Sequence, residues 1–357
     1  MTADAEIAVI VHAYARKEYL PFALRSIAAQ TLARDRFELV VSKSFWDPEI
    51  DRQLDALGAV SIHDEDRLNS RCLHRGLGAS RAPIITFLDD DDEYEPERLE
   101  RVLETMRAHP GVGFYRNRVR AIDENGQPIP PERWRVHMRD SVFDALGPLE
   151  IAPDGKAKLL ELAKAKNRIW ASFNSSSMAI RRELLDGDVG NAFDEAGLNA
   201  DLFLFVAGVL ASGGMYLDDR RLTRYRYSPR ARYRMFSGNA VKSVASLGDV
   251  AEVYHAMAAL AARHGRLDFA KWLDADSVYW ERLFRGCTLL DRVTEGAEGS
   301  EVARLSKEFV RFLLRKAPSK ALRPDVWRAG AYALAYLCAP RVAQHLAKAR
   351  FGSGGIV

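Results

Sequence analysis

The sequence predicts an α/β protein in which a mixed, mainly parallel sheet is covered by helices and followed by a helical C-terminal region. Short apolar runs alternate with helical patterns from residue 7 to about residue 115, which is typical of a helix-covered parallel sheet. The run at residues 84–88 is too continuous to have a solvent-exposed face. From about residue 240 onward the pattern is helical throughout.

The first half of the sheet follows from the order of the apolar runs. Strands are predicted at residues 7–11, 37–41, 59–62 and 84–88, and helices at about residues 20–27, 51–57 and 73–80. Pro96 opens a further helix at its first turn. Residues 1–115 are therefore predicted to form a nucleotide-binding half, whose ligands lie at the carboxyl ends of the strands.

The second half of the domain, residues 116–235, is less regular. The patterns predict a loop around residues 128–131, a helix at 156–166, a strand at 173–180, a helix at 201–210 and a last strand at 215–227. We expect the irregular segment 116–170 to shape an acceptor pocket. The predicted organisation is a domain of residues 1–235, divided at residue 115, and a helical region of residues 236–357.

Composition restricts the class of protein. The 357 residues are 48% hydrophobic and 28% charged, and 52 basic residues offset 49 acidic ones to a net charge of +3. This balance argues against a nucleic-acid-binding protein. Three widely spaced cysteines fit neither a metal-ligand pattern nor a disulfide framework. No signal peptide or membrane-spanning stretch is recognisable, so we expect a cytoplasmic protein.

The strongest chemical signal is the acidic run Asp89-Asp90-Asp91-Asp92, directly after the buried strand 84–88. Carboxylates at the mouth of a parallel sheet repel one another unless a cation or hydrogen-bond donors compensate, and hard oxygen ligands select Mg²⁺ or Mn²⁺. The alternative is an acidic turn that caps the helix opened by Pro96. The buried strand favours the metal site, because it fixes where the aspartates point.

Two ordered segments resemble the signatures of family 2 glycosyltransferases, which have the GT-A fold. The first consists of Ile10-Val11-His12-Ala13-Tyr14, Tyr19-Leu20 and Ser26-Ile27-Ala28-Ala29-Gln30-Thr31. The second consists of Leu73-His74-Arg75-Gly76-Leu77 and the segment from Ile84 to Asp92. Residues 175–182 and the segments Phe193-Asp194-Glu195 and Asp201-Leu202-Phe203-Leu204 are similar to later parts of the family pattern, so the resemblance covers about residues 7–230.

The resemblance implies an inverting transfer of a sugar from a nucleoside-diphosphate sugar to an acceptor hydroxyl of a saccharide or lipid-linked saccharide. By analogy Asp91 would bind Mg²⁺ or Mn²⁺, Asp89 would contact the metal or the ribose, and Asp201 would be the general base. The residues assigned to the donor site are Ala13, Tyr14, Arg16, Ser42, His74, Asp89, Asp90, Arg224 and Arg226. Asp92 receives no role.

The sequence departs from the family pattern at two places. Ser42-Lys43 replaces the usual acidic pair after the second strand, which leaves the nucleobase contact open, and Asp47 could compensate. Tyr227 stands where the family often has a metal- or diphosphate-binding histidine. We therefore expect arginines to neutralise the diphosphate. Asn174-Ser175-Ser176 also matches the N-glycosylation acceptor pattern, without consequence in a cytoplasmic protein.

Seven arginines lie between residues 220 and 234, interleaved with tyrosines. Strand alternation puts Arg224 and Arg226 on one face, where they could meet the donor diphosphate or an anionic lipid acceptor; a solvated edge strand is the alternative. Basic residues among aromatics can also bind single-stranded nucleic acid, but the acidic run would repel its backbone, so no nucleic-acid partner is expected.

The apolar segment 326–339 is followed by Arg341, Lys348 and Arg350. It is too short to cross a bilayer. A helix packed in the C-terminal region or in a homodimer interface is one reading, and peripheral contact with the inner face of a membrane is another.

Two alternative functions remain open, a sugar nucleotidyltransferase and a non-catalytic sugar-nucleotide-binding protein. A nucleotidyltransferase normally has a glycine-rich loop after its first strand, and the segment His12-Ala13-Tyr14-Ala15-Arg16 contains no glycine.

Overall fold

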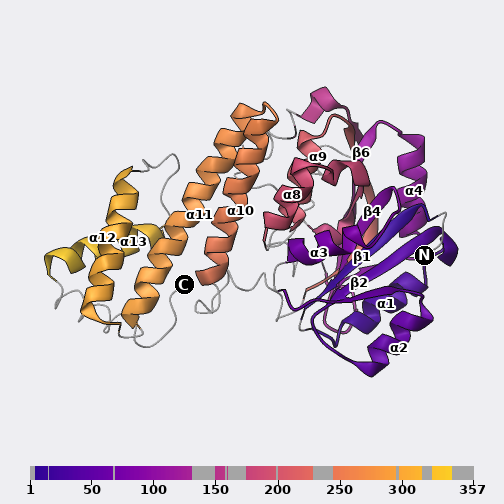
Figure 1. Ribbon diagram of the computed structural model, residues 1–357, viewed down its shortest axis with the longest axis horizontal. Helices are drawn as coiled ribbons and strands as arrows, with labels where there is room; N and C mark the ends of the chain where they lie inside the picture. Colours follow the sequence, from indigo (N-terminus) through magenta and orange to yellow (C-terminus); the bar gives the residue numbers. More distant parts are fainter. Residues whose placement is uncertain are drawn as a thin grey trace. The chain divides into compact units, whose positions relative to one another are not determined.

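The computed structural model describes most of the chain. The described residues are 5–14, 16–66, 69–130, 149–156, 159, 174–197, 200–227, 244–294, 297–315 and 324–339. They fall into two compact units (Figure 1). The first comprises Met1–Ser228 and Leu260–Arg266, and the second Pro229–Ala259 and Leu267–Val357. The predicted divisions of the chain at residues 115 and 235 stay predictions.

The first unit is built on one mixed sheet, in the strand order β3-β2-β1-β4-β8-β6-β9-β5, with β7 paired to β9. The strands are β1 (Ile7–Ala13), β2 (Phe37–Lys43), β3 (Val60–His63), β4 (Ile84–Asp89), β5 (Glu93–Tyr94), β6 (Val112–Ile122), β7 (Leu149–Ile151), β8 (Met178–Arg181) and β9 (Gly214–Arg226). The pairs β2–β3, β1–β2, β1–β4 and β6–β9 are parallel, whereas β8 runs antiparallel between β4 and β6. The predicted α/β class is confirmed.

Helices cover both faces of this sheet (Figure 1). The helices of the first unit are α1 (Leu20–Ala28), α2 (Pro48–Ala56), α3 (Asn69–Gly78), α4 (Arg98–Ala108), α8 (Asp188–Glu195) and α9 (Ala200–Leu210). Apolar side chains of α1, α2 and α4 form one core with alternate residues of β1, such as Val9 and Val11. On the opposite face α3 lies against Ile10, and α9 lies against Phe114.

Local sequence explains where these elements begin. Helix α2 starts at Pro48 because the Asp47 carboxylate accepts hydrogen bonds from the N–H groups of Glu49 and Ile50, at 3.1 and 3.3 Å. Asp47 is thus the helix cap, and it also pairs with Lys17 at 3.2 Å. Asp47, which the sequence analysis considered as a substitute contact to the nucleobase, is therefore engaged in capping α2.

The second half of the sheet differs from the sequence prediction. Strand β6 covers residues that we expected to be irregular, and the predicted strand 173–180 begins only at Met178, after a 3₁₀ turn at Ser175–Ser177. The three serines of this turn are buried; Ser177 Oγ donates to the Asn174 carbonyl at 2.7 Å, whereas Ser175 and Ser176 are hydrogen-bonded to Asp89. Most of the predicted helix 156–166 lies outside the described residues.

The second unit is helical, as the sequence predicts. Its helices are α11 (Leu267–Thr294), α12 (Gly299–Arg315), α13 (Pro324–Cys338) and most of α10 (Val244–Arg263). Leu289, Phe309 and Ala333 lie in a core shared by α11, α12 and α13, whereas Leu334 and Leu337 of α13 are exposed. One face of α13 therefore packs inside its unit. Within the described residues, no helix is both long enough and apolar enough to span a membrane.

Candidate active site

The acidic run lies at the carboxyl end of strand β4, beside the end of β1. Asp89 is the last residue of β4 and lies opposite His12 of β1 in the parallel register. The chain then turns, and the Asp92 N–H donates to the Asp89 carbonyl oxygen at 3.1 Å. The turn keeps the successive carboxylates at one edge of the sheet, where ligands bind in folds of this kind.

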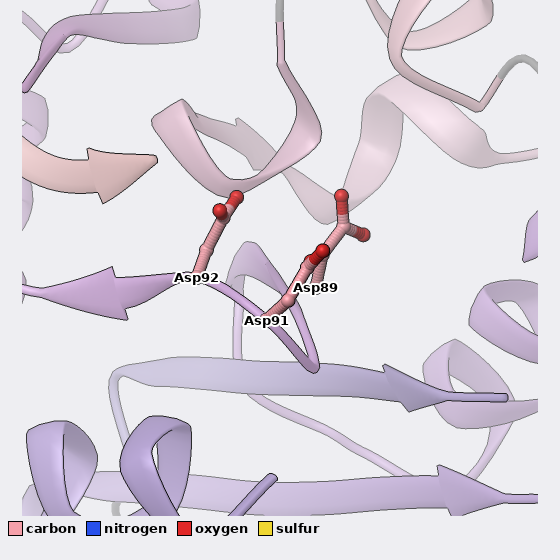
Figure 2. A group of neighbouring side chains, drawn as sticks. All are labelled: Asp89, Asp91 and Asp92. Atoms are coloured by element: carbon pink, nitrogen blue, oxygen red, sulfur yellow. The ribbon is translucent and has the colours of Figure 1, made fainter. Parts of the chain in front are cut away.

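Three of the four carboxylates converge. Oxygen atoms of Asp89, Asp91 and Asp92 all lie within 4.8 Å of one another. Figure 2 shows the three side chains extending toward the same space from the end of β4 and the turn that follows it. Asp91 and Asp92 are buried and Asp89 is half-buried. Such a set of hard oxygen atoms can hold a divalent cation. The predicted ligands Asp89 and Asp91 are brought together, and Asp92 joins them.

Asp92 is anchored by donors from distant parts of the chain. The Asn174 Nδ2 donates to Asp92 Oδ2 at 2.6 Å, and the Arg226 N–H donates to Asp92 Oδ1 at 2.9 Å. Burial raises the pKa of the Asp92 carboxyl well above its ordinary value, and repulsion from Asp91 and Asp89 adds to this, against the hydrogen bonds from Ser176 and Arg226. The hydrogen bonds therefore fix the orientation of the carboxyl, while burial and the neighbouring charges disfavour its ionised form.

Asp89 is held by the 3₁₀ turn. Ser175 Oγ donates to the Asp89 carboxylate oxygens at 3.3 and 3.4 Å, and the Asp89 N–H donates to Ser176 Oγ at 3.0 Å. The segment Asn174-Ser175-Ser176 thus fixes the acidic run, a role that sequence reasoning missed. The available signal was a run of small polar residues directly before a buried apolar strand.

Asp90 points to the loop after β1. It is fully buried and accepts a hydrogen bond from the Tyr14 N–H at 3.2 Å. The guanidinium of Arg16 bridges two carboxylates, because its NH2 group pairs with Asp90 and its NH1 group pairs with Asp91. Burial raises the pKa of the Asp90 carboxyl well above its ordinary value, while Arg16 opposes this shift. The predicted donor-site residues Tyr14, Arg16 and Asp90 are therefore in direct contact.

Arg226 is fully buried behind the acidic turn. Its guanidinium donates to the carbonyl oxygens of Asp91, Asp123 and Glu124 at 2.8–2.9 Å and pairs with Glu93. Arg224 donates to both carboxylate oxygens of Glu95 at 3.0 and 3.2 Å. These two arginines bind β9 to the segment that follows the acidic run. Their predicted contact with a diphosphate stays a prediction.

The carboxyl ends of β2 and β3 carry a second polar group. Ser42 is buried and donates to Asp64 at 3.3 Å, and Arg75 holds the same carboxylate with two hydrogen bonds of 2.6 and 2.7 Å. Lys43 is also buried, and its Nζ pairs with Asp51 at 2.9 Å. Asp64 and Arg75, which the sequence analysis did not single out as site residues, surround the predicted donor contact Ser42.

The remaining predicted residues lie on neighbouring elements. Ala13 ends β1, and its carbonyl accepts from the Ser44 N–H at 3.0 Å. His74 of α3 contacts Asp194 of α8 through Nδ1 at 3.2 Å. Asp201 lies in the first turn of α9, where its Oδ1 accepts from the Leu202 N–H at 2.8 Å. The structure therefore brings Tyr14, Arg16, Asp89, Asp90, Asp91 and Arg226 into one cluster of contacts, and the roles of Ala13, His74 and Asp201 stay predictions.

The fold and this site define a glycosyltransferase. Residues 8–186, about half of the chain, match Glycosyl transferase family 2, and the protein belongs to this family. An uncharacterized glycosyltransferase of Haemophilus influenzae is 27% identical over 110 residues, which are 30% of this chain and 37% of the relative. One of Nostoc sp. is 24% identical over 190 residues, or 51% and 52% of the two chains. The match spans about half or less of these relatives.

Solved structures support the fold. The crystal structure of S. aureus TarS 1–349 in complex with UDP has a TM-score of 0.55 at 16% identity, covering 99% of this chain and 94% of that one. The same protein in complex with UDP-GlcNAc gives a TM-score of 0.52 at 15% identity, covering 96% and 89%. At these identities the likeness concerns the fold alone. The predicted GT-A architecture with C-terminal helices is confirmed.

Proposed function

We propose that the protein transfers a sugar from a nucleoside-diphosphate sugar to an acceptor hydroxyl, with Mg²⁺ or Mn²⁺ held by Asp89 and Asp91. The observation that carries this proposal is the convergence of oxygen atoms from Asp89, Asp91 and Asp92 within 4.8 Å at the end of β4. In a family 2 glycosyltransferase, this edge of the sheet is where a nucleotide is expected to bind. A cation held there would supply charge neutralisation at the departing diphosphate.

The residues present fit a divalent cation. Carboxylate oxygens are the ligands that Mg²⁺ and Mn²⁺ prefer, and Mg²⁺ completes its shell with phosphate oxygens and water. Asn174 Oδ1 is proposed as a further candidate ligand, because this buried oxygen has no hydrogen-bond partner among the described residues. Burial raises the pKa of the Asp92 carboxyl, and repulsion from Asp91 and Asp89 raises it further; a bound cation would relieve that repulsion. Asp92, with its orientation fixed by Asn174 and Arg226, is proposed as a third oxygen ligand.

Asp201 is proposed as the general base. It lies at the start of α9, a helix that contacts the 3₁₀ turn holding Asp89. A carboxylate within hydrogen-bond reach of the acceptor hydroxyl removes its proton as the oxygen attacks the anomeric carbon. Attack opposite to the departing diphosphate inverts this carbon. The TarS complexes with UDP and UDP-GlcNAc make UDP-sugars the first donors to test.

The acceptor is proposed to be a hydroxyl of a saccharide or lipid-linked saccharide. Peripheral membrane contact through the C-terminal helices, a homodimer and a cytoplasmic location belong to the same proposal. Each can be tested separately, by vesicle co-sedimentation, by the mass in solution and by cell fractionation.

The experiment that tests the function is donor turnover. The protein is incubated with UDP-, GDP- and dTDP-sugars and Mn²⁺, and the release of nucleoside diphosphate is measured. Asp91→Asn should abolish Mn²⁺-dependent donor binding, and Asp201→Asn should keep donor binding but eliminate transfer. Asp219→Asn, at an exposed position of β9, is the matched control. Metal-independent turnover by Asp91→Asn would refute the metal assignment, and full activity of Asp201→Asn would refute the base.

A further inference from the structure

Arg16 occupies an unusual position between two carboxylates of the acidic run. Its side chain is only 24% exposed, and its two terminal nitrogens each pair with a different aspartate, Asp90 and Asp91. Burial alone would lower the pKa of the Arg16 guanidinium, but the charges of the four aspartates, Asp91 first, raise it above its ordinary value. Arg16 is therefore a permanent cation placed at the predicted metal ligand.

The two aspartates bound by Arg16 differ in their other partners. Asp90 also accepts from the Tyr14 N–H, so it remains anchored if the arginine moves. For the Asp91 carboxylate, Arg16 is the one hydrogen-bonding side chain found within the described residues. By contrast, Asp89 and Asp92 are held by serine and asparagine side chains that carry no charge. Asp91, which converges with Asp89 and Asp92, is thus neutralised by the guanidinium of a partly exposed arginine.

A divalent cation and the Arg16 guanidinium compete for Asp91. Both are positively charged, and two cations on one carboxylate in a buried site repel each other strongly. The divalent cation can therefore replace the guanidinium at Asp91 only if the displaced guanidinium nitrogen binds another anion. A diphosphate offers one, because arginine presents its donors in a planar fork that suits phosphate oxygens.

We propose that Arg16 substitutes for the metal at Asp91 and exchanges this carboxylate for a diphosphate oxygen when the divalent cation and the donor bind together. Its NH2 group keeps Asp90, while its NH1 group leaves Asp91 and donates to the diphosphate. This inference rests on the proposed function. Its consequence is a coupling between two ligands: the metal binds weakly without the nucleotide, and each ligand strengthens the binding of the other.

The test compares Mn²⁺ binding with and without a nucleoside diphosphate. Calorimetric titrations with Mn²⁺ alone, and with Mn²⁺ in the presence of saturating UDP or GDP, are made on the full chain. In Arg16→Gln, the affinity for Mn²⁺ alone should rise at least about fivefold, the lower end of typical coupling factors. The factor by which the nucleotide increases Mn²⁺ affinity should fall to the part that direct contact between the cation and the phosphate oxygens supplies.

Lys17→Gln is the matched control. Lys17 is the neighbouring cation, but its side chain is 61% exposed and pairs with Asp47, outside the acidic run. Lys17→Gln should bind Mn²⁺ with the same affinity as the unaltered protein, both with and without the nucleoside diphosphate. If Arg16→Gln does not fold, as judged by circular dichroism, Arg16→Lys is used instead. One ammonium cannot bridge both carboxylates as the guanidinium fork does. We therefore expect the two Mn²⁺ affinities to change in the same directions, but by smaller factors.

The outcomes separate this inference from the function on which it rests. If the unaltered protein binds Mn²⁺ with the nucleotide and Arg16→Gln gives the same two affinities, the exchange is refuted and the metal site stands. A loss of Mn²⁺ affinity in the variant without nucleotide would also refute it. If neither protein binds Mn²⁺ under either condition, the metal assignment fails, and the exchange fails with it.

Discussion

Asn174 and Asp92, which are 82 positions apart in the sequence, are joined by a hydrogen bond of 2.6 Å from Nδ2 to Oδ2. Both side chains are buried, with 4% and 1% of their surfaces exposed. The bond connects the segment before β8 to the acidic run after β4, and so fixes one of the three converging carboxylates. The geometry of the candidate metal site therefore depends on a residue outside the acidic motif.

Replacing Asn174 with leucine should weaken both folding and metal binding. The substitution keeps the approximate size of the side chain but removes a donor from a buried carboxylate, which typically costs about 1–3 kcal/mol. We expect the free energy of unfolding, measured by urea denaturation, to fall by this amount, and Mn²⁺ affinity to fall with it. Asn191→Leu, on the exposed side of α8, should change stability by less than about 0.5 kcal/mol. Equal effects of the two variants would contradict the role of Asn174.

A substitution of Arg226 can show whether this residue stabilises the fold or binds the donor. Arg226→Lys keeps the charge but loses the fork that donates to Asp91, Asp123 and Glu124. Losing buried hydrogen bonds of this kind should lower the free energy of unfolding by about 2 kcal/mol. Arg220→Lys, at an exposed position of the same strand, is the control. If Arg226→Lys instead kept full stability and lost donor affinity, Arg226 would be a diphosphate contact, as the sequence analysis expected.

The first half of the fold was predictable because it obeys simple patterns. The apolar strands β1 and β2 are buried along their whole length, and β4 is buried up to Leu88. Buried parallel strands read as continuous apolar runs. The acidic run could be found for a related reason, since a polar cluster that ends such a strand must lie at the ligand-binding edge. The acidic run was located in this way, whereas the roles of Asp89 and Asp91 within it came from the resemblance to family 2 glycosyltransferases.

The second half was harder to predict because its buried residues are polar. Strand β6 contains Arg116 and Asn117, which are fully buried, so its sequence lacks the apolar alternation of a strand. The contacts of Asn174, Ser175 and Ser176 with the acidic run connect residues more than 80 positions apart. Such contacts depend on strand order, which a single sequence does not specify. The local patterns at these positions, a predicted strand, a resemblance to the family and a glycosylation acceptor, did not indicate contacts with the acidic run.

Helix α3 depends on a close approach to strand β1 at Gly76. A Cβ atom at this position would lie 2.5 Å from Cγ2 of the buried Ile10. Gly76→Ala should therefore force the helix and strand apart and lower the free energy of unfolding by about 1–3 kcal/mol, as overpacking usually does. Gly78→Ala is the matched control in the same helix, because nothing lies within 4 Å of its added Cβ. Thermal unfolding that ranks Gly78→Ala as the more damaging change would refute this packing.

The ion pair of Asp64 with Arg75 should make stability depend on pH. Burial would raise the pKa of the Asp64 carboxyl, but hydrogen bonds from Arg75 and from the Asp66 N–H outweigh it, so the pKa is lowered. A carboxyl with a lowered pKa in the folded state stabilises the protein above its unfolded pKa of about 3.9, and this contribution disappears as the pH falls through the folded value.

Asp64→Asn tests this pH dependence. At pH 7 it should lower the free energy of unfolding by about 1–3 kcal/mol, because hydrogen bonds to a charged group are lost. The difference between the variant and the unaltered protein should shrink as the pH is lowered below about 4. Asp55→Asn, at an exposed position of α2, should change stability by less than about 0.5 kcal/mol at pH 7. Urea denaturation at several pH values measures both, and a difference that grows on acidification would contradict the sign derived for Asp64.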